Sequence, residues 1–335
     1  MAPGDLADCF ALLERKSGGT TRDGKPFFRV QFRDARRTAT AMIWSDGAWY
    51  ADCQSKWKEQ QFYKLRCLYS ESPQYGSQLE IDRIRLVEEA DRAAGFNPDE
   101  FFAQSRFDPR EMLADLDQIA RREITQPALR TLVTDLLAEH AEMLLVMSAA
   151  ARNHHAFPGG YLEHVLSVTR TAVFLAEKYA ALYPECPVDK NLVVAGAILH
   201  DIGKILELEH ARSGAHYTPA GRLIGHILLG RDLIRDKART LPDLDPETLL
   251  RLEHIVVSHQ NLPEWGSPIP PHTLEALLVH YADDIDAKYQ MMVQALLDDR
   301  SSRSAGDELS PGREFTARDN ALQRRVFKGL PPPAK

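Results

Sequence analysis

The sequence has few cysteines, no apolar run long enough to cross a membrane and no excess of positive charge. Its four cysteines are scattered and none forms a C-x-x-C pair, which disfavours a structural zinc cluster and indicates a reducing compartment. The first residues carry neither a basic start nor an apolar signal core. A formal net charge of −7 gives no overall attraction to nucleic acid. We therefore expect a cytoplasmic protein without a membrane partner.

The length and composition describe a globular protein with more than one folded unit. A chain of 335 residues exceeds what one hydrophobic core usually organises. Its hydrophobic fraction of 44% and charged fraction of 27% are ordinary for a globular protein. They exclude a collagen-like, mucin-like or wholly disordered chain. At least two domains are therefore expected.

The N-terminal part of the chain has the pattern of a small barrel. Turn signals at Gly18-Gly19 and Asp23–Pro26 precede short segments in which apolar and polar side chains alternate, as in a strand. These segments cover residues 28–33, 38–44, 62–69 and 78–86. Such a succession of short strands predicts an antiparallel barrel. Residues 20–87 also carry four more positive than negative charges, so this is the electropositive part of the chain.

Helical patterns dominate from residue 108 onward, and strand signals are almost absent there. Amphipathic stretches predict helices over residues 110–121, 126–151, 160–182, 190–206, 219–238, 246–258 and 272–298. We expect a helical connector over residues 93–150, an all-α domain over 151–300 and a partly irregular tail over 301–335. The expected fold is α+β and multidomain, with a small N-terminal β-barrel over residues 1–92 followed by the all-α domain.

An adjacent histidine and aspartate, His200 and Asp201, end a helix that is expected to be buried. Residues 192–199, which precede them, are apolar on nearly every side. An unpaired carboxylate in such surroundings is strongly destabilising. A divalent cation would neutralise it, and mixed histidine and carboxylate donors suit manganese, iron, zinc or cobalt. The alternative is an ordinary hydrogen bond between the two side chains at the end of the helix.

Four further residues repeat this pattern on other helices. His164 lies among apolar residues and His226 starts an apolar helical turn. His259 ends an apolar-rich helix, and Asp283 interrupts an apolar helical face. Each of them alone is more typical of a buried polar residue with a hydrogen-bond partner. Five helices that each direct a histidine or an aspartate toward the core together predict a metal site.

These residues resemble a known family signature. The order His164, His200-Asp201, Asp283 resembles the H…HD…D pattern of the HD-domain metal-dependent phosphohydrolases. The stretch HHAFPGGYLEH, which ends at His164, is similar to the start of the HD domain in YhaM-type 3′→5′ exoribonucleases. Later stretches similar to that family are Leu199–Lys204, Gly225-His226, Ser258-His259, Glu264–Pro268 and His280–Lys288. The sequence departs from the family pattern at Gln260, where a second histidine is expected, and at His272, where a less polar residue is usual.

The resemblance implies an OB-fold in the N-terminal barrel, an HD domain over residues 151–300 and one or two divalent cations per chain. Manganese is the first choice, and iron, cobalt, zinc or magnesium are alternatives. The implied ligands of one cation are His164, His200, Asp201 and Asp283. His226 and His259 would complete a second site that Asp201 bridges. Lys204 lies one helical turn beyond His200, where it would stabilise a pentacoordinate phosphorus; a simple interaction with a helix dipole is the alternative.

Candidate nucleic-acid contacts lie mainly in the barrel. Two or three of its aromatic side chains, Trp44 among them, are expected to stack on bases. The basic side chains expected to contact phosphates are Lys25, Arg29, Arg33, Lys64 and Arg66. Trp265 is expected to floor the active-site cleft. His155 is expected either to contact the substrate or to have a capping or core role.

The implied function is a metal-dependent 3′→5′ exonuclease that shortens single-stranded RNA, with DNA as a further candidate, and releases nucleoside 5′-monophosphates. Two alternatives stay open. The first is a phosphohydrolase of nucleotides or cyclic dinucleotides with a regulatory barrel, against which the appended OB-like barrel argues. The second is a non-catalytic nucleic-acid-binding protein with a structural metal site, which the complete ligand set disfavours. Self-association into a homo-oligomer is compatible with the sequence.

Overall fold

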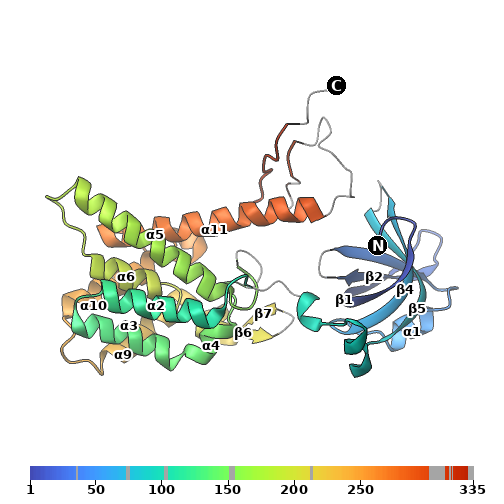
Figure 1. The fold of residues 1–335 in the computed structure, drawn as a ribbon, viewed down its shortest axis with the longest axis horizontal. Coiled ribbons are helices and arrows are strands. Elements are labelled where there is room, and N and C mark those ends of the chain that lie inside the picture. Colours follow the sequence, from blue (N-terminus) through green and yellow to red (C-terminus); the bar gives the residue numbers. More distant parts are fainter. Residues whose placement is uncertain are drawn as a thin grey trace. The chain divides into compact units, whose positions relative to one another are not determined.

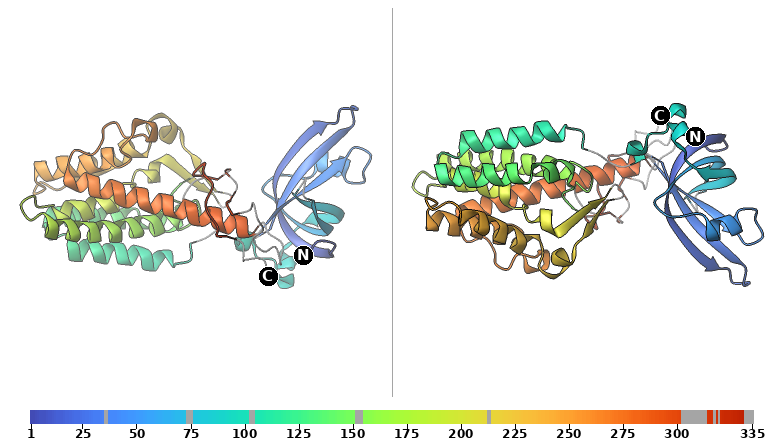
Figure 2. Two further views of the ribbon diagram at one scale, coloured as in Figure 1. Left: turned by 90° about the horizontal axis from the view of Figure 1, so that it is seen from above. Right: turned by 90° about the horizontal axis from the view of Figure 1, so that it is seen from below.

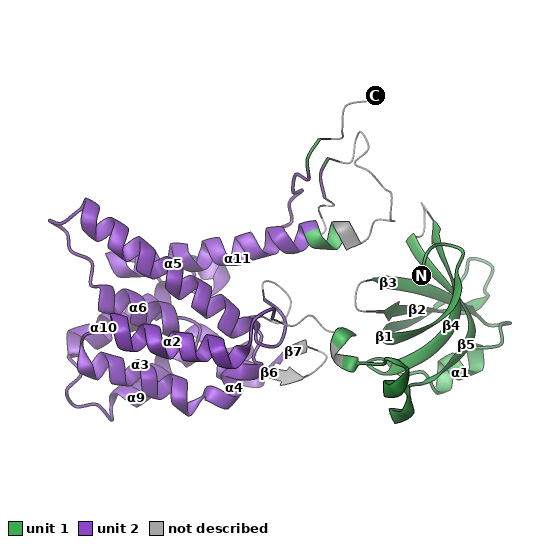
Figure 3. Ribbon diagram, viewed as in Figure 1, with its two compact units in different colours: residues 1–103, 297–314, 329–335 green, residues 104–296, 315–328 purple. Residues whose placement is uncertain are grey.

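The computed structural model describes residues 1–34, 37–72, 76–101, 105–150, 155–211, 214–301, 314–316, 318 and 320–330. The chain forms two compact units (Figure 3). The first comprises residues 1–103, 297–314 and 329–335, and the second comprises residues 104–296 and 315–328. No helix within the described ranges is long and apolar enough to cross a membrane.

The first unit contains a five-stranded barrel (Figure 1). Its elements are β1 (Leu6–Thr20), β2 (Pro26–Arg33), β3 (Thr38–Trp44), α1 (Tyr50–Ser55), β4 (Phe62–Ser72) and β5 (Gly76–Leu86). The strand order β1-β2-β3-β5-β4, closed by pairing of β4 with β1, is that of an OB-fold. The expectation of a purely antiparallel barrel is wrong at one place, because β3 pairs with β5 in parallel at Thr40 and Gln78. A ring with an odd number of strands cannot alternate in direction all the way round.

Strand β1 was not expected, and the turn expected at Gly18-Gly19 is wrong. Both glycines lie inside β1, where Gly18 pairs with Phe28 and Gly19 pairs with Phe27. A Cβ atom on Gly19 would come within 2.6 Å of the Phe27 ring. Glycine at this position therefore leaves room for an aromatic side chain of β2 rather than reversing the chain.

The barrel encloses its own apolar core. The buried side chains include Leu13, Val30, Phe32, Trp57 and Leu65. A second small cluster joins the short helices η1 (Glu89–Ala94) and η2 (Pro98–Phe101) to the barrel through Leu12, Phe96 and Phe101. The residues between the barrel and the helical unit are thus packed against the strands as far as Phe101.

The second unit is a helical bundle, and Figure 2 shows its long helix α11 from two sides. Its helices are α2 (Pro109–Glu123), α3 (Pro127–Glu139), α4 (Ala141–Val146), α5 (Gly160–Leu182), α6 (Lys190–Leu199), α7 (Lys204–Glu207), α8 (Pro219–Leu223), α9 (His226–Ala238), α10 (Pro246–Ser258) and α11 (Leu274–Ser301) as far as residue 296. Helices α2, α3 and α4, expected as a connector, share one hydrophobic core with α5, α6 and α10. A short hairpin, β6 (Leu208–Ala211) and β7 (Gly214–Tyr217), was not expected.

Three predicted helices are interrupted in the structure. The stretch 126–151 divides into α3 and α4 at His140, and 219–238 divides into α8 and α9 at Gly225. The stretch 190–206 divides at His200, where α6 ends and a turn leads to α7. The periodicity of apolar residues continues through each break, so it did not reveal them. The last of these turns carries the centre of the candidate site.

Part of the expected irregular tail packs on the second unit. Residues 315–328 belong to that unit, and Phe315 pairs with Phe327 through an isolated β-bridge. Thr316 and Val326 are buried, with 5% and 6% of their surfaces exposed. Residues 302–313, 317, 319 and 331–335 lie outside the described residues, so the expectation of irregular structure stays a prediction there.

Candidate metal centre

Five helices bring the six expected ligands together inside the second unit. His164 lies on α5, His200 and Asp201 follow the end of α6, and His226 is the first residue of α9. His259 caps the C-terminus of α10, and Asp283 lies on α11. All except His226 are buried, with at most 5% of their surfaces exposed. The fold therefore brings the six predicted ligands together.

The six side chains form two groups of possible ligands. The first group is His164, His200 and Asp283, and the second is Asp201, His226 and His259. Within each group, one donor atom from every residue lies within 4.8 Å of the others. Asp201 also adjoins the first group, because its Oδ2 lies 3.6 Å from His164 Nε2 and 3.5 Å from His200 Nε2. One carboxylate thus faces both groups.

In each of the four histidines, the ring nitrogen that points away from the centre, Nδ1, contacts a hydrogen-bond acceptor. His164 Nδ1 lies 2.7 Å from Asp286 Oδ2, and His226 Nδ1 lies 3.0 Å from Glu207 Oε1. His200 Nδ1 donates to the Ala197 carbonyl at 2.8 Å and His259 Nδ1 to the Val256 carbonyl at 2.7 Å. Because ionised carboxylates and carbonyls only accept, Nδ1 carries the proton. A neutral ring in this tautomer presents the lone pair of Nε2 to the centre, as in histidine metal sites.

Three of the atoms that face the centre lack hydrogen-bond partners among the described residues. Asp201 Oδ1, His226 Nε2 and His259 Nε2 are buried and make no hydrogen bond. The distances from Asp201 Oδ1 to these nitrogens are 3.3 and 3.6 Å. Unsatisfied buried polar atoms are costly. A cation would satisfy all three at once, so the donor set fits a divalent metal.

The electrostatics of the centre also favour a cation. Burial opposes ionisation of Asp201, but the Lys204 ammonium and the His200 ring outweigh burial and hold its pKa well below the usual range. Burial likewise disfavours protonation of His164, yet contacts with Asp283 and Asp286 raise its pKa to about 9. Burial lowers the pKa of His259, which favours its neutral, metal-binding form. The ionised carboxylates and the neutral His259 ring are in the protonation states that metal binding requires, and a cation bound at the first group would displace the second ring proton of His164.

Gly203 permits the close packing that positions the second group. The turn after Asp201 lies directly against α9, and a Cβ atom on Gly203 would come within 2.0 Å of the His226 carbonyl oxygen. It would also come within 2.3 Å of the backbone nitrogen of Gly230. Any other residue at position 203 would push α9, and with it His226, away from Asp201.

Lys204 points into the same centre. It is buried, and its Nζ lies 2.5 Å from Asp201 Oδ2. The alternative, a cation that interacts only with a helix dipole, does not describe this position, because the Lys204 ammonium contacts a candidate ligand. Lys204 thus balances part of the negative charge of Asp201 and places a fixed positive charge at the centre.

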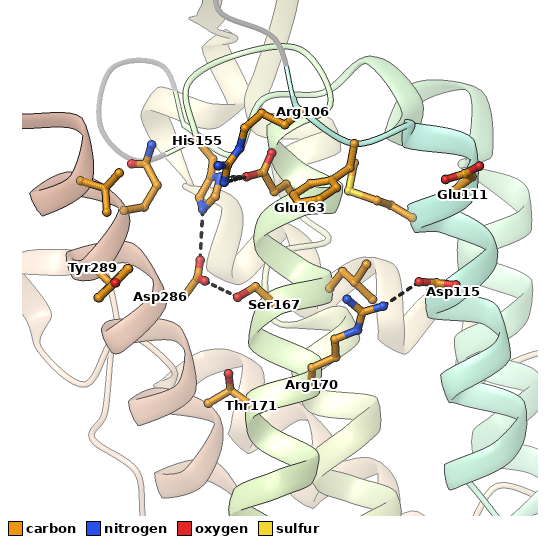
Figure 4. Close-up of a pocket in the computed structure, with 15 residues that line it drawn as sticks. Arg106, Glu111, Asp115, His155, Glu163, Ser167, Arg170, Thr171, Asp286 and Tyr289 are labelled. Atoms are coloured by element: carbon orange, nitrogen blue, oxygen red, sulfur yellow. Dashed lines mark hydrogen bonds and ion pairs between the residues drawn. The ribbon is translucent and has the colours of Figure 1, made fainter. Parts of the chain in front are cut away.

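Sequence reasoning missed the residues that hold the histidines. In addition to its contact with His164, Asp286 accepts a hydrogen bond from Ser167 Oγ at 2.5 Å and contacts His155 Nε2 at 3.2 Å. Asp286, Ser167 and His155 also line a cavity of about 590 Å³ between α2, α5 and α11 (Figure 4). Asp286 follows Asp283 by three residues, one helical turn, and that spacing is the signal that could have identified it. Glu207 has no comparable signal, because α7 and α9 are brought together only by the fold.

The structure also shows the surroundings of Gln260, His155 and Trp265. Gln260, where the family pattern has a histidine, donates from Nε2 to Asp283 Oδ2 at 3.3 Å. His155 is 5% exposed and contacts Asp286, an arrangement that supports positioning of the His164 ligand. Its neighbour His154 lies outside the described residues. Trp265 is half-exposed and lines a cavity that also includes Asp283.

The expected nucleic-acid contacts of the barrel lie on two different sides. Lys25, Arg29, Arg33 and Trp44 belong to the region of β2 and β3, where Phe27 pairs with Trp44 and Lys25 Nζ lies 5.6 Å from the Trp44 ring centre. Lys64 and Arg66 lie on β4, which neighbours β1 and β5 instead. Trp44 is 40% exposed. Among the other aromatic side chains of the barrel that could stack on bases, Trp49 and Tyr50 pack on the barrel core and Trp57 is part of it. Tyr75 lies outside the described residues.

The two basic groups also differ in their ion pairs. Lys64 Nζ lies 3.4 Å from the buried Asp91, which Arg85 holds as well, and Arg66 pairs with Asp8 at 3.2 Å. Lys25 pairs with Asp46, and Arg33 lies 3.7 Å from Glu14. For Arg29, no ion pair is found within the described part of the chain. The β2–β3 side therefore combines an exposed indole with an uncompensated guanidinium.

An OB-fold barrel and a helical bundle with converging histidines and aspartates define a metal-dependent phosphohydrolase of the HD class. The family model described as "HD domain" matches residues 161–288, which contain all six candidate ligands. A second model, described as "Putative helicase", matches residues 96–213.

Curated relatives cover almost the whole chain. The 3′-5′ exoribonuclease YhaM of Oceanobacillus iheyensis is 34% identical over 326 residues, which are 97% of this chain and 94% of the relative. The YhaM proteins of Bacillus subtilis and Bacillus licheniformis are 33% and 30% identical over 97% of this chain and 95% of their own lengths. The chain belongs to the YhaM-type 3′→5′ exoribonuclease family.

A solved structure is similar to the barrel alone. The second OB-fold domain of replication protein A from Methanococcus maripaludis covers 27% of this chain and 90% of its own, with 15% identity and a TM-score of 0.20. The strand pairing described above, rather than this similarity, defines the OB topology.

Proposed function

We propose that the protein is a metal-dependent 3′→5′ exonuclease that shortens single-stranded RNA and releases nucleoside 5′-monophosphates. The observation that carries this proposal is the set of buried, unsatisfied donor atoms on Asp201, His226 and His259 in a chain of the YhaM-type family. The OB-fold barrel supports a polymeric substrate, because such barrels bind single strands by stacking and phosphate contacts. Action on RNA would place the protein in the cytoplasm.

We assign the six converging side chains to two cation sites that share Asp201. His164, His200, Asp201 and Asp283 hold one cation, and His226 and His259 complete the second. The mixture of imidazole and carboxylate donors suits borderline cations, and manganese is our first choice. When bound, such cations stabilise the phosphodiester oxygens and make the attacking water more acidic.

The other residues of the centre position these ligands and the substrate. Asp286 and Glu207 hold Nδ1 of His164 and His226, so both rings keep Nε2 directed inward. Gln260 restrains the second oxygen of Asp283. We assign Lys204 to electrostatic stabilisation of the charge that develops on the phosphoryl oxygens, because its ammonium already lies at Asp201.

The proposal is tested with protein purified without chelator and single-stranded RNA labelled at its 5′ end. We expect a ladder of labelled products that shortens progressively from the 3′ end, with activity lost in chelator and restored by manganese. Thin-layer analysis of the released nucleotides should show 5′-monophosphates. An intact oligonucleotide beside a hydrolysed free or cyclic nucleotide would instead identify a small-molecule phosphohydrolase.

Substitution of the second group distinguishes two cations from one. His226→Ala and His259→Ala should each lower the bound metal from about two ions per chain toward one, since each removes an Nε2 donor that has no other partner. Metal analysis after gel filtration measures this. His216→Ala is the control, because His216 is an exposed residue of β7. Unchanged stoichiometry in both variants would assign the two histidines to structural roles.

A further inference from the structure

A cavity of about 300 Å³ lies directly beside the metal centre. Asp283 and Gln260 form one part of its lining, and Trp265 forms another. Met291 of α11 and Leu322 of the C-terminal segment add apolar surface. The cavity therefore combines a candidate metal ligand, an exposed indole and apolar walls, a combination typical of small-ligand sites.

Two cationic side chains also line this cavity, and their surroundings differ. Lys288 pairs with Asp284 at 2.7 Å, and its ammonium lies 5.5 Å from the centre of the Trp265 ring. Arg324 comes from the C-terminal segment, and its side chain is exposed. No ion pair to the Arg324 guanidinium is found across the described ranges. A guanidinium without a carboxylate partner remains able to bind an anion in a bidentate manner.

The backbone that carries Arg324 is held in place. The Asn320 side-chain amide donates to the Arg324 carbonyl at 2.5 Å, and the Arg324 backbone N–H lies 3.4 Å from Asn320 Oδ1. Thr316 N donates to the Val326 carbonyl at 2.8 Å, and Val326 N donates back to Thr316 Oγ1 at 3.0 Å. Hydrogen bonds within the segment thus fix its backbone, and the bond from Val326 N to Thr316 Oγ1 is buried, so the position of Arg324 is part of the fold.

We infer that Arg324 binds a phosphate group of the nucleotide at the metal centre and that Trp265 contacts its base, so that the C-terminal segment completes the substrate site. This inference rests on the proposed nuclease function, because it assigns a nucleotide to the cavity. The chemistry matches in each part: an anionic phosphate meets Arg324, a planar base meets an indole, and Asp283 adjoins the cleavable bond. The adjacent Arg325 is exposed but does not line the cavity.

The test compares two ligands that differ only in the phosphate. Binding of adenosine 5′-monophosphate and of adenosine to the manganese-loaded protein is measured by calorimetry for wild type, Arg324→Ala, Arg324→Lys and Arg325→Ala. We expect Arg324→Ala to weaken binding of the monophosphate by about tenfold or more, as for loss of a charge-assisted contact. Binding of adenosine should stay within about twofold of wild type, Arg324→Lys should be intermediate, and Arg325→Ala should resemble wild type.

Trp265→Ala provides the complementary result, because loss of a stacking surface should weaken binding of both ligands by a similar factor. Equal effects of Arg324→Ala and Arg325→Ala, or equal losses for both ligands in Arg324→Ala, would overturn the inference. Metal content and circular dichroism verify that the variants are folded and loaded. A separate result would contradict the nuclease proposal itself: wild-type protein that does not cleave end-labelled RNA.

Discussion

Replacement of Asp201 by alanine is expected to reduce hydrolysis by several orders of magnitude while the helical unit stays folded. Asp201 Oδ1 faces His226 and His259, and Oδ2 faces His164 and His200. It is the one side chain of the six whose two oxygens address both groups. Its removal therefore weakens both cation sites and, with them, activation of the attacking water.

The measurement combines turnover of labelled RNA with metal analysis of the same preparation. Asp236→Ala is a matched control, because Asp236 is an exposed aspartate on α9 that pairs with Arg239 at 2.6 Å. Loss of Asp201 also leaves the buried Lys204 ammonium without its partner, so thermal unfolding is recorded to separate a folding defect from a catalytic one. Near-native activity at full metal content would contradict the assignment of Asp201.

The convergence of the six candidate ligands could be predicted from the sequence because these residues interrupt strong apolar patterns. A carboxylate such as Asp201 after a wholly apolar helix requires a partner, and the sequence shows this requirement without any coordinates. The same reasoning could not find Glu207 or Asp286. Asp286 lies at a partly exposed helix position, where acidic residues are common, and Glu207 lies in a helix of four residues, which is too short to show an apolar pattern. Only the approach of α7 to α9 and of α11 to α5 reveals their role.

The sequence predicted which segments form strands and which form helices better than it predicted how these elements pair and pack. Alternation of apolar residues identified β2, β3, β4 and β5, but β1 was missed because it ends in the glycine-rich sequence Ser17–Thr20, which resembles a turn. Its register with β2 depends on the Phe27 ring, a contact between strands that no local pattern encodes. The C-terminal segment was likewise expected to be partly irregular, because Thr316 and Val326 are buried only through packing on the helical unit.

The barrel also shows why surface contacts were harder to predict than ligands. The sequence pattern of a strand does not show whether a basic side chain is free in solvent or paired with a neighbouring carboxylate. Lys64 and Arg66 alternate with core residues of β4 as expected, but both have acidic partners in space. Arg29 and Trp44 lie across β2 and β3 on the other side of the barrel. The structure thus divides one predicted surface into two with different capacities for phosphate.

This division predicts that the β2–β3 side carries most of the affinity for long single strands. The triple substitution Arg29→Ala, Arg33→Ala and Trp44→Ala should weaken binding of a long oligonucleotide by more than about tenfold, because one lost stacking surface alone contributes about 1–3 kcal/mol. Affinity of the unmodified protein should fall as salt rises, and the triple variant should show a shallower salt dependence, since phosphate contacts release counterions. Fluorescence anisotropy at two salt concentrations measures both effects.

The matched control is the double substitution Lys64→Ala and Arg66→Ala on β4. It removes two positive charges, as the triple variant does, but these charges are already partnered by Asp91 and Asp8. Asp91 stays paired with Arg85 in this control, at 2.6 Å, so the barrel should remain folded. Cleavage of a dinucleotide should be unchanged in both variants, because a substrate of that length depends on the metal centre alone. Equal weakening of long-strand binding by both variants would show that charge, and not the exposed indole and free guanidinium of the β2–β3 side, determines binding.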